Sequence, residues 1–418
     1  MNRIPLRALA AGLAVAVAAV ACTGSGASSP ANASPSARAS ASPAASASMQ
    51  ATAETSMTKA ADLRVALNLL LLDHVYLTGA TTNQALLGND AGFTAAAATL
   101  DKNTLGLGDA IGSVYGDAAK AKFVDLWRKH IGFFVEYTQA AAKSDMAGKQ
   151  KATAELDGYR ADFDAFLSDA NPNLPKGAVA DLLVSHVTGL EAMIDAQAAK
   201  DPAWSDKAKT AATHSQKIAD PLAGAIAKQF PDKVTGDPMA KAAGLRTTMN
   251  LLLDEHVHLT SYATGAATGG NDAAFTAAAK TLDTNTVALG DAIGSVYADS
   301  GKTTFLDLWR KHIGFFVAYT QGAVKNDMAA KQKATTDLDG YRKDFDTFIT
   351  GANPNLPKGA VADLLAKHVT GLESVIDSQA AKDNKSFDLA ETTANHSQKI
   401  ADPLAEAIVK QFPAKLGG

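Results

Sequence analysis

A run of residues that occurs twice constrains the fold of this chain more than any other feature. The residues Asn171–Asp181 return unchanged as Asn353–Asp363, 182 positions later, and the same shift carries Leu126–Val135 onto Leu308–Val317. Self-similarity at a fixed distance is typical of chains built from repeated structural units. We therefore predict two homologous units, at residues 58–233 and 240–416, joined by a Pro/Gly-containing linker at 234–239.

A shorter period within each unit indicates helical hairpins. His74, His130 and His186 follow one another at equal intervals, and each has two apolar residues three and four positions before it. Apolar residues recur at alternating steps of three and four, which is the pattern of one helix face. No stretch alternates long enough to indicate a sheet. The sequence predicts an all-α fold of two tandem six-helix units, each built of three αα-hairpins, after a disordered N-terminal tether.

The segment 1–22 has the layout of a secretory signal. Arg3 and Arg7 precede an apolar run that ends Ala19-Val20-Ala21-Cys22, and this ending resembles a bacterial lipobox. Lipidation of Cys22, the only cysteine, would anchor the protein to the cell membrane, whereas ordinary cleavage farther on would release it by secretion. Residues 23–57 are almost entirely Ser, Ala, Pro, Gly and Thr, so we predict a disordered linker. We expect an extracytoplasmic lipoprotein.

Composition and missing motifs exclude several functions. Lys+Arg 39 against Asp+Glu 43 gives a net charge of −4, which does not favour a nucleic-acid partner. One cysteine cannot supply a thiolate zinc site or an iron–sulfur cluster. No Gly-x-Ser-x-Gly elbow occurs, and no cysteine nucleophile is indicated. We therefore do not expect an enzyme, although a redox activity is a third alternative, and the sequence indicates no protein partner.

Eight of the nine histidines form two matching sets. Most of them lie on the apolar stripe of their helices and are expected to point inward, where an imidazole needs a hydrogen-bond partner or a ligand. The predicted metal-site residues are His74, His130, His186 and His214 and, in the second unit, His256, His312, His368 and His396. Only His258 has no counterpart in the other unit.

Two interpretations of these histidines remain open. In the first, they bind a metal ion (copper, zinc or iron) or a haem, with nearby aspartates orienting the ligands or joining them. In the second, the protein is a non-catalytic interaction or structural module, and each histidine only makes a buried hydrogen bond to one of the same aspartates. The aspartates are Asp101, Asp157, Asp283 and Asp339.

The run Glu255-His256-Val257-His258 is similar to a Glu-x-x-His di-iron element. The first unit reads Asp73-His74-Val75-Tyr76 at the equivalent positions, so the second histidine is missing there. Residues two apart on a helix also point to different sides. We therefore predict no separate site at His258.

The Leu126–Val135 run, its copy, and the two Asn-Pro-Asn-Leu-Pro turns resemble a group of secreted bacterial helical proteins, some labelled copper amine oxidase-like. The resemblance covers about residues 58–416 and implies no established activity. A true copper amine oxidase forms its quinone cofactor from the tyrosine of an Asn-Tyr motif, and no Asn-Tyr pair occurs in this chain. The resemblance thus implies only that copper is a ligand worth testing.

Overall fold

The computed structural model describes residues 55–417. Helices and no strands are found within this range, which confirms the predicted all-α fold. The predicted signal at 1–22, including Cys22, and the predicted linker up to residue 54 lie outside the described residues. Within residues 55–417, none of the helices combines the length and the hydrophobicity that a membrane crossing requires.

The first unit consists of six helices joined by short turns. Side chains cap three of them: Thr58, Asn89 and Asp145 each accept a hydrogen bond from the backbone N–H three residues later. The helices are α1 Lys59–Leu86, α2 Asp90–Tyr115, α3 Asp117–Ala142, α4 Met146–Ala170, α5 Ala178–Ala198 and α6 Trp204–Gln229.

The second unit follows the same order, with one apparent difference. Its α8 is continuous where the first unit has α2 and α3, but Ala298 breaks it with φ 63° and ψ −175°. The equivalent Gly116, with φ 87° and ψ 172°, separates α2 from α3. Both units therefore contain six helical segments, as predicted. The helices are α7 Lys241–Thr268, α8 Asp272–Lys325, α9 Met328–Ala352, α10 Ala360–Ala380 and α11 Ser386–Gln411, followed by the short α12 Pro413–Leu416.

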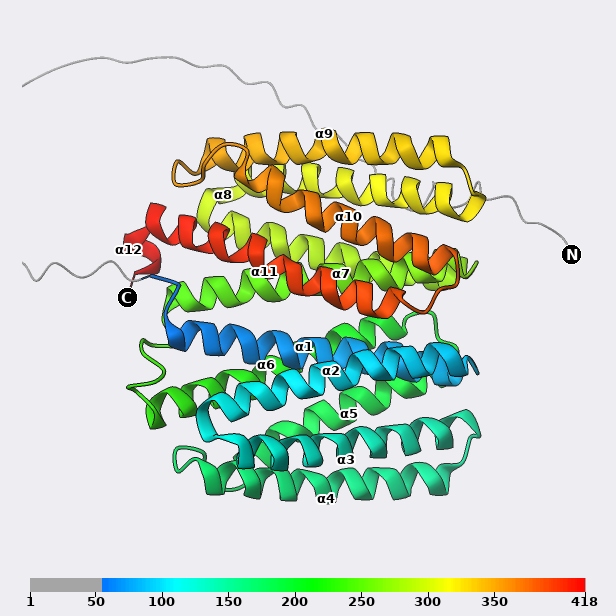
Figure 1. Cartoon of the computed structure of the whole chain (residues 1–418), viewed down its shortest axis with the longest axis vertical. Coiled ribbons are helices and arrows are strands. Elements are labelled where there is room, and N and C mark those ends of the chain that lie inside the picture. Colours follow the sequence, from blue (N-terminus) through cyan, green and yellow to red (C-terminus); the bar gives the residue numbers. More distant parts are fainter. Residues whose placement is uncertain (1–54, 418) are drawn as a thin grey trace, which may run out of the picture. The chain divides into compact units, whose positions relative to one another are not determined.

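Helices α1 and α7 lie side by side at the centre of the described part of the chain, with α3 and α4 at one end and α9 at the other (Figure 1). Each central helix is covered by its own unit and by the other unit. Because helices of both units pack against them, α1 and α7 have buried residues on all sides rather than along one stripe. One apolar cluster spans both units, because Leu251, Leu259 and Leu282 of the second unit pack with side chains of the first.

The contact between the two units is close to two-fold symmetric. His258 forms a hydrogen bond with Asp73 across the interface, and Tyr76 donates one to Glu255. In the repeat, His258 is equivalent to Tyr76 and Asp73 is equivalent to Glu255. The equivalent rings of Tyr76 and His258 stack on each other with centroids 5.0 Å apart and planes at 5°. Such a reciprocal pattern is that of an isologous dimer interface, here formed within one chain.

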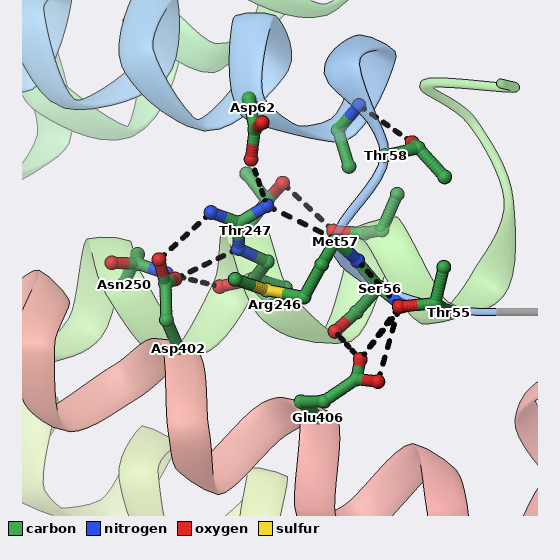
Figure 2. Close-up of polar contacts among 12 residues, drawn as sticks. Thr55, Ser56, Met57, Thr58, Asp62, Arg246, Thr247, Asn250, Asp402 and Glu406 are labelled. Atoms are coloured by element: carbon green, nitrogen blue, oxygen red, sulfur yellow. Dashed lines mark hydrogen bonds and ion pairs between the residues drawn. The ribbon is translucent and has the colours of Figure 1, made fainter. Parts of the chain in front are cut away.

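The chain just before α1 is fastened to the second unit (Figure 2). Ser56 donates from its backbone N–H and its hydroxyl to Glu406, and the Ser56 carbonyl accepts from Arg246. Arg246 also pairs with Asp402 and Asp62. The sequence assigned residues 55–57 to the disordered linker; they instead belong to the folded part, because these polar contacts hold them against α7 and α11.

Candidate metal centres

Three helices of the first unit bring three histidines together in its core. His74 comes from α1, His130 from α3 and His186 from α5, and each is at most 3% exposed. The Nε2 atoms of His74 and His130 lie 3.3 Å apart. One ring nitrogen from each of the three histidines lies within 4.8 Å of the others. The apolar pair before each histidine positions its ring, since residues three and four apart share a helix face with it.

The second unit repeats this arrangement with the same geometry. His256 of α7 and His312 of α8 place their Nε2 atoms 3.4 Å apart. His368 of α10 completes the second triad, again with one nitrogen per ring within 4.8 Å. The distances between ring centroids are nearly equal in the two triads: 5.2, 5.6 and 6.4 Å in the first and 5.3, 5.8 and 6.5 Å in the second.

Aromatic rings enclose each triad. In the first unit the Trp127 ring lies edge-on 5.0 Å from His74, and Tyr159 stacks on His130 at 4.8 Å. Burial lowers the pKa of His74 and His130 well below the usual 6.5, and the other imidazoles of the triad lower it further. Burial lowers the pKa of His186 to about 4. All three rings are therefore neutral near pH 7, which is the protonation state that binds metal.

Several triad nitrogens are buried without a hydrogen-bond partner in residues 55–417. They include Nδ1 of His74 and of His130 and both ring nitrogens of His186. The second triad leaves the equivalent four nitrogens unpartnered. Buried polar atoms in native proteins are nearly always bonded, and the exceptions commonly mark an ion or water. The Nε2 atoms of His74 and His130 lie within hydrogen-bond distance of each other, as do those of His256 and His312. His186 and His368 are therefore the triad rings that make no hydrogen bond within the described residues.

The fourth histidine of each predicted set lies outside the triad. His214 and His396 are half-buried on α6 and α11. The His396 Nε2 atom lies 3.3 Å from the carbonyl of Leu364. His214 lies near enough to His186 to lower the pKa of that ring. The structure therefore brings together three of the four predicted histidines in each unit.

The aspartates predicted to orient the histidines instead lie at the surface and pair with arginines. Asp101 accepts two hydrogen bonds from Arg128, and Asp157 accepts one from Arg160. The second unit repeats these pairs with Asp283 and Arg310 and with Asp339 and Arg342. The prediction that these carboxylates contact the histidines is wrong, because helical rotation places them on the outer faces of their helices.

The packing around the triads suits an ion better than a haem. In the second unit a cavity of about 30 Å³ lies beside His368, bordered by apolar side chains such as Trp309 and Phe345. That volume holds about one water molecule. A haem macrocycle is far larger, and the rings that pack against the histidines fill the space it would need.

The sequence analysis missed a third cluster, which lies between the two units. His258, the unmatched histidine, lies 2.9 Å from Asp73 and 3.4 Å from Asp254. Burial and the charge of Asp254 raise the pKa of Asp73 to about 8, and burial and the charge of Asp73 do the same for Glu391. As expected from their spacing, His256 and His258 point to different sites. The break in the repeat at His258 was the signal for this cluster.

Comparison of the chain with protein-family models, with curated proteins and with solved structures found no match. The case for a function therefore depends on the geometry of these clusters.

Proposed function

We propose that this protein is an extracytoplasmic, membrane-tethered metal-binding protein that holds one transition-metal ion in each histidine triad. The observation that carries the proposal is the convergence, in both units, of one ring nitrogen from each of three buried histidines. Two nitrogens that bind one ion at 2.0–2.1 Å with a tetrahedral angle are about 3.3–3.4 Å apart. The 3.3 and 3.4 Å separations of the Nε2 pairs match that value.

The electrostatics of the triads favour copper in its monovalent state. No carboxylate within the described residues contacts either triad, and all three ligands are neutral. An ion bound there keeps its full charge in an apolar interior, and the cost of burying charge rises steeply with its magnitude. Imidazole is a suitable copper ligand. Cu⁺ therefore fits the triads better than Zn²⁺ or Fe²⁺, and the resemblance to proteins labelled copper amine oxidase-like supports testing it first.

The alternative function is a structural module in which the histidines only hold the helices together. That interpretation relied on bonds between each histidine and an aspartate, and the aspartates pair with arginines instead. A purely structural role would leave several buried nitrogens unbonded in each unit, at roughly 1–3 kcal/mol for each group. An ion held by the converging nitrogens would bond one of the two free nitrogens of His186 and of His368, while the Nδ1 atoms of the other rings would stay unbonded.

The location of the protein is part of the proposal and rests on the sequence of the segment 1–22. Lipidation of Cys22 would tether the folded part to the outer side of the cell membrane. Cys22→Ser tests the anchor: we expect the variant in the culture medium and the parent in the membrane fraction. Membrane retention of the variant would overturn the anchor without affecting the metal sites.

The metal-binding proposal is tested on the folded protein without a His-tag, loaded with Cu⁺ under reducing conditions. Isothermal titration and elemental analysis should find two ions per chain. His130→Leu should lower the count to one, and His130→Leu with His312→Leu should abolish binding. His214→Ala with His396→Ala is the matched control, because these histidines lie outside the triads, and it should keep both ions. Equal copper in the parent and the double triad variant would refute the proposal.

A further inference from the structure

The interface between the two units contains a second kind of buried cluster, rich in carboxylates. Asp73 comes from α1, Asp254 and His258 come from α7, and Glu391 comes from α11. The side chains of Asp73, Asp254 and His258 are 0%, 2% and 4% exposed, and that of Glu391 is 13% exposed. This site is separate from the triads, because Asp73 faces α7 while the adjacent His74 faces the core of the first unit.

The ligand atoms of the cluster converge. The Nε2 atom of His258 lies 2.9 Å from Oδ1 of Asp73, 3.4 Å from Oδ1 of Asp254 and 4.0 Å from Oε2 of Glu391. Oxygen and nitrogen ligands about 2.1 Å from one ion are separated by about 3.0–3.4 Å in octahedral or tetrahedral geometry. The first two distances are close to those values without any movement of the helices.

Three carboxylate oxygens in the cluster are buried and have no hydrogen-bond partner within residues 55–417: Oδ2 of Asp73, Oδ1 of Asp254 and Oε2 of Glu391. Buried carboxyl oxygens without a hydrogen bond are costly in a protein interior, and this cost is reflected in the raised pKa of Asp73 and of Glu391. A cation that all of them contact would remove this cost. The lack of hydrogen bonds at these oxygen atoms is a second observation, in addition to the grouping of acidic residues.

The pseudo-two-fold symmetry of the interface allows the cluster to be compared with the equivalent half, where a protein cation is present. On the other side of the pseudo-two-fold axis, Glu255 takes the place of Asp73 and Tyr76 takes the place of His258. There Lys209 places its ammonium group on Glu255, which also accepts bonds from Tyr76 and Asn285. That half of the interface is therefore neutralised by a protein cation.

Within the described residues, no lysine or arginine pairs with the carboxylates in the half that contains Asp73. Its positive charge comes from His258: burial lowers the pKa of this imidazole, but bonds to Asp254 and Asp73 outweigh burial and raise it well above 6.5. The residue equivalent to Lys209 is Glu391, and the residue equivalent to Asp254 is Leu72. The half around Asp73 therefore has Glu391 in place of Lys209 and the carboxylate of Asp254 in place of Leu72. It also has the imidazole of His258 in place of the phenol ring of Tyr76. Because the pKa values of Asp73, Glu391 and His258 are all raised, the metal-free cluster holds protons near pH 7, and a divalent cation would take the place of those protons.

We propose that Asp73, Asp254, His258 and Glu391 form a binding site for one divalent cation at the interface between the two units. Carboxylate oxygens with a single imidazole suit Mn²⁺, Fe²⁺ or Zn²⁺. On binding, the protons held by His258, Asp73 and Glu391 leave to solvent, and the imidazole nitrogen and the three carboxylates contact the ion.

A pocket lies next to this site. It has a volume of about 480 Å³, lies at the ends of the central helices, and is lined by His258, Tyr76 and Tyr262, and by Leu87, which is 67% exposed. The pocket reaches His258, while the three carboxylates lie behind that residue.

Mn²⁺ is the probe that tests the site, because a triad of imidazoles without carboxylates holds this ion poorly. Binding is measured on the metal-free protein from the loss of the sharp EPR spectrum of aqueous Mn²⁺, with the thermal melting temperature as a second readout. The parent should bind one Mn²⁺ per chain and melt at a higher temperature with the ion than without it.

Glu391→Lys is the decisive variant, because it places an ammonium group where the first unit has Lys209. It should keep the fold and weaken Mn²⁺ binding by at least about tenfold. Asp73→Asn, which changes no side-chain volume, should weaken binding as well. Asp388→Asn is the matched control: this carboxylate is exposed on the same helix and should leave Mn²⁺ binding unchanged.

The proposal is overturned if the parent binds no Mn²⁺ at millimolar concentration, or if Glu391→Lys and Asp73→Asn bind it as tightly as the parent does. Neither result bears on copper in the triads, since the variants leave the triad histidines in place.

Discussion

Lys209 and Glu391 occupy equivalent positions in the two units and carry opposite charges at the same interface. Lys209 neutralises the buried Glu255, whereas Glu391 places a further carboxyl group beside Asp73 and His258. An ancestral symmetric pair of units would have placed the same residue at both positions. The exchange of a cation for an anion is the clearest way in which the two units differ.

Replacing Glu391 by lysine should stabilise the metal-free protein. The new ammonium group would pair with the buried carboxylates and remove their mutual repulsion, so we expect the free energy of unfolding to rise by about 1–3 kcal/mol. Urea titration in the presence of a chelator measures it. A variant less stable than the parent under these conditions would show that the cluster is not short of positive charge.

Ala298 holds a backbone conformation that is nearly confined to glycine, with φ 63° and ψ −175°. Ala298→Gly should therefore stabilise the protein by about 1–2 kcal/mol. Gly116→Ala introduces the same strain at the equivalent position of the first unit and should destabilise it by a similar amount. Thermal melting of both variants is the measurement. Effects of the same sign in the two variants would refute the assignment of strain to this turn.

Glu406→Gln should loosen the chain before α1. Burial alone would raise the pKa of Glu406, but hydrogen bonds from Ser56 and Thr55 outweigh it and hold the pKa below the usual 4.5. A lowered pKa in the folded state means that the carboxylate stabilises the protein above pH 4.5 and that this contribution disappears as the pH falls through the lowered value. We expect a loss of about 1 kcal/mol at pH 7.

The pH dependence separates this contribution from a general loss of packing. Stability of the parent and of Glu406→Gln is compared by urea titration from pH 7 to pH 3. The two curves should converge at the acid end. A constant difference across the whole range would mean that the charge of Glu406 contributes nothing to holding Ser56.

His130→Leu should leave the metal-free protein within about 1 kcal/mol of the parent, or make it more stable. The substitution removes a buried imidazole whose Nδ1 has no partner, and no carboxylate loses a bond with it; the bond that is lost is the one between the Nε2 atoms of His130 and His74. The same urea titration with and without Cu⁺ reports the result. A loss of about 3 kcal/mol or more without metal would indicate that the imidazole is a structural element of the core.

The sequence was sufficient to predict the helices and the triads for a physical reason. Histidines that recur at a constant interval, each with an apolar pair one turn earlier, have to lie on inward faces when every hairpin packs in the same way. His74 and His130 therefore meet in the core. The same argument does not extend to His214, which follows His186 by 28 residues rather than 56 and is half-buried outside the triad.

Sequence periodicity could not predict contacts between the two units. Asp73 and His258 are 185 residues apart and meet only because α1 and α7 pack side by side. The predicted contacts between aspartates and histidines were wrong for a different reason. Asp101 belongs to the same hairpin region as the histidines, but its side chain points outward and pairs with Arg128. A local sequence pattern predicts which face of a helix is buried, whereas contacts between the two units depend on how their buried faces pack together.

The most direct test of the account is the number of cuprous ions bound per chain by the tag-free protein, compared with that of the variant carrying His130→Leu and His312→Leu. The account predicts two ions for the parent and none for the variant, with both proteins folded by circular dichroism. A parent that binds no copper, or a variant that binds as much as the parent, would contradict it.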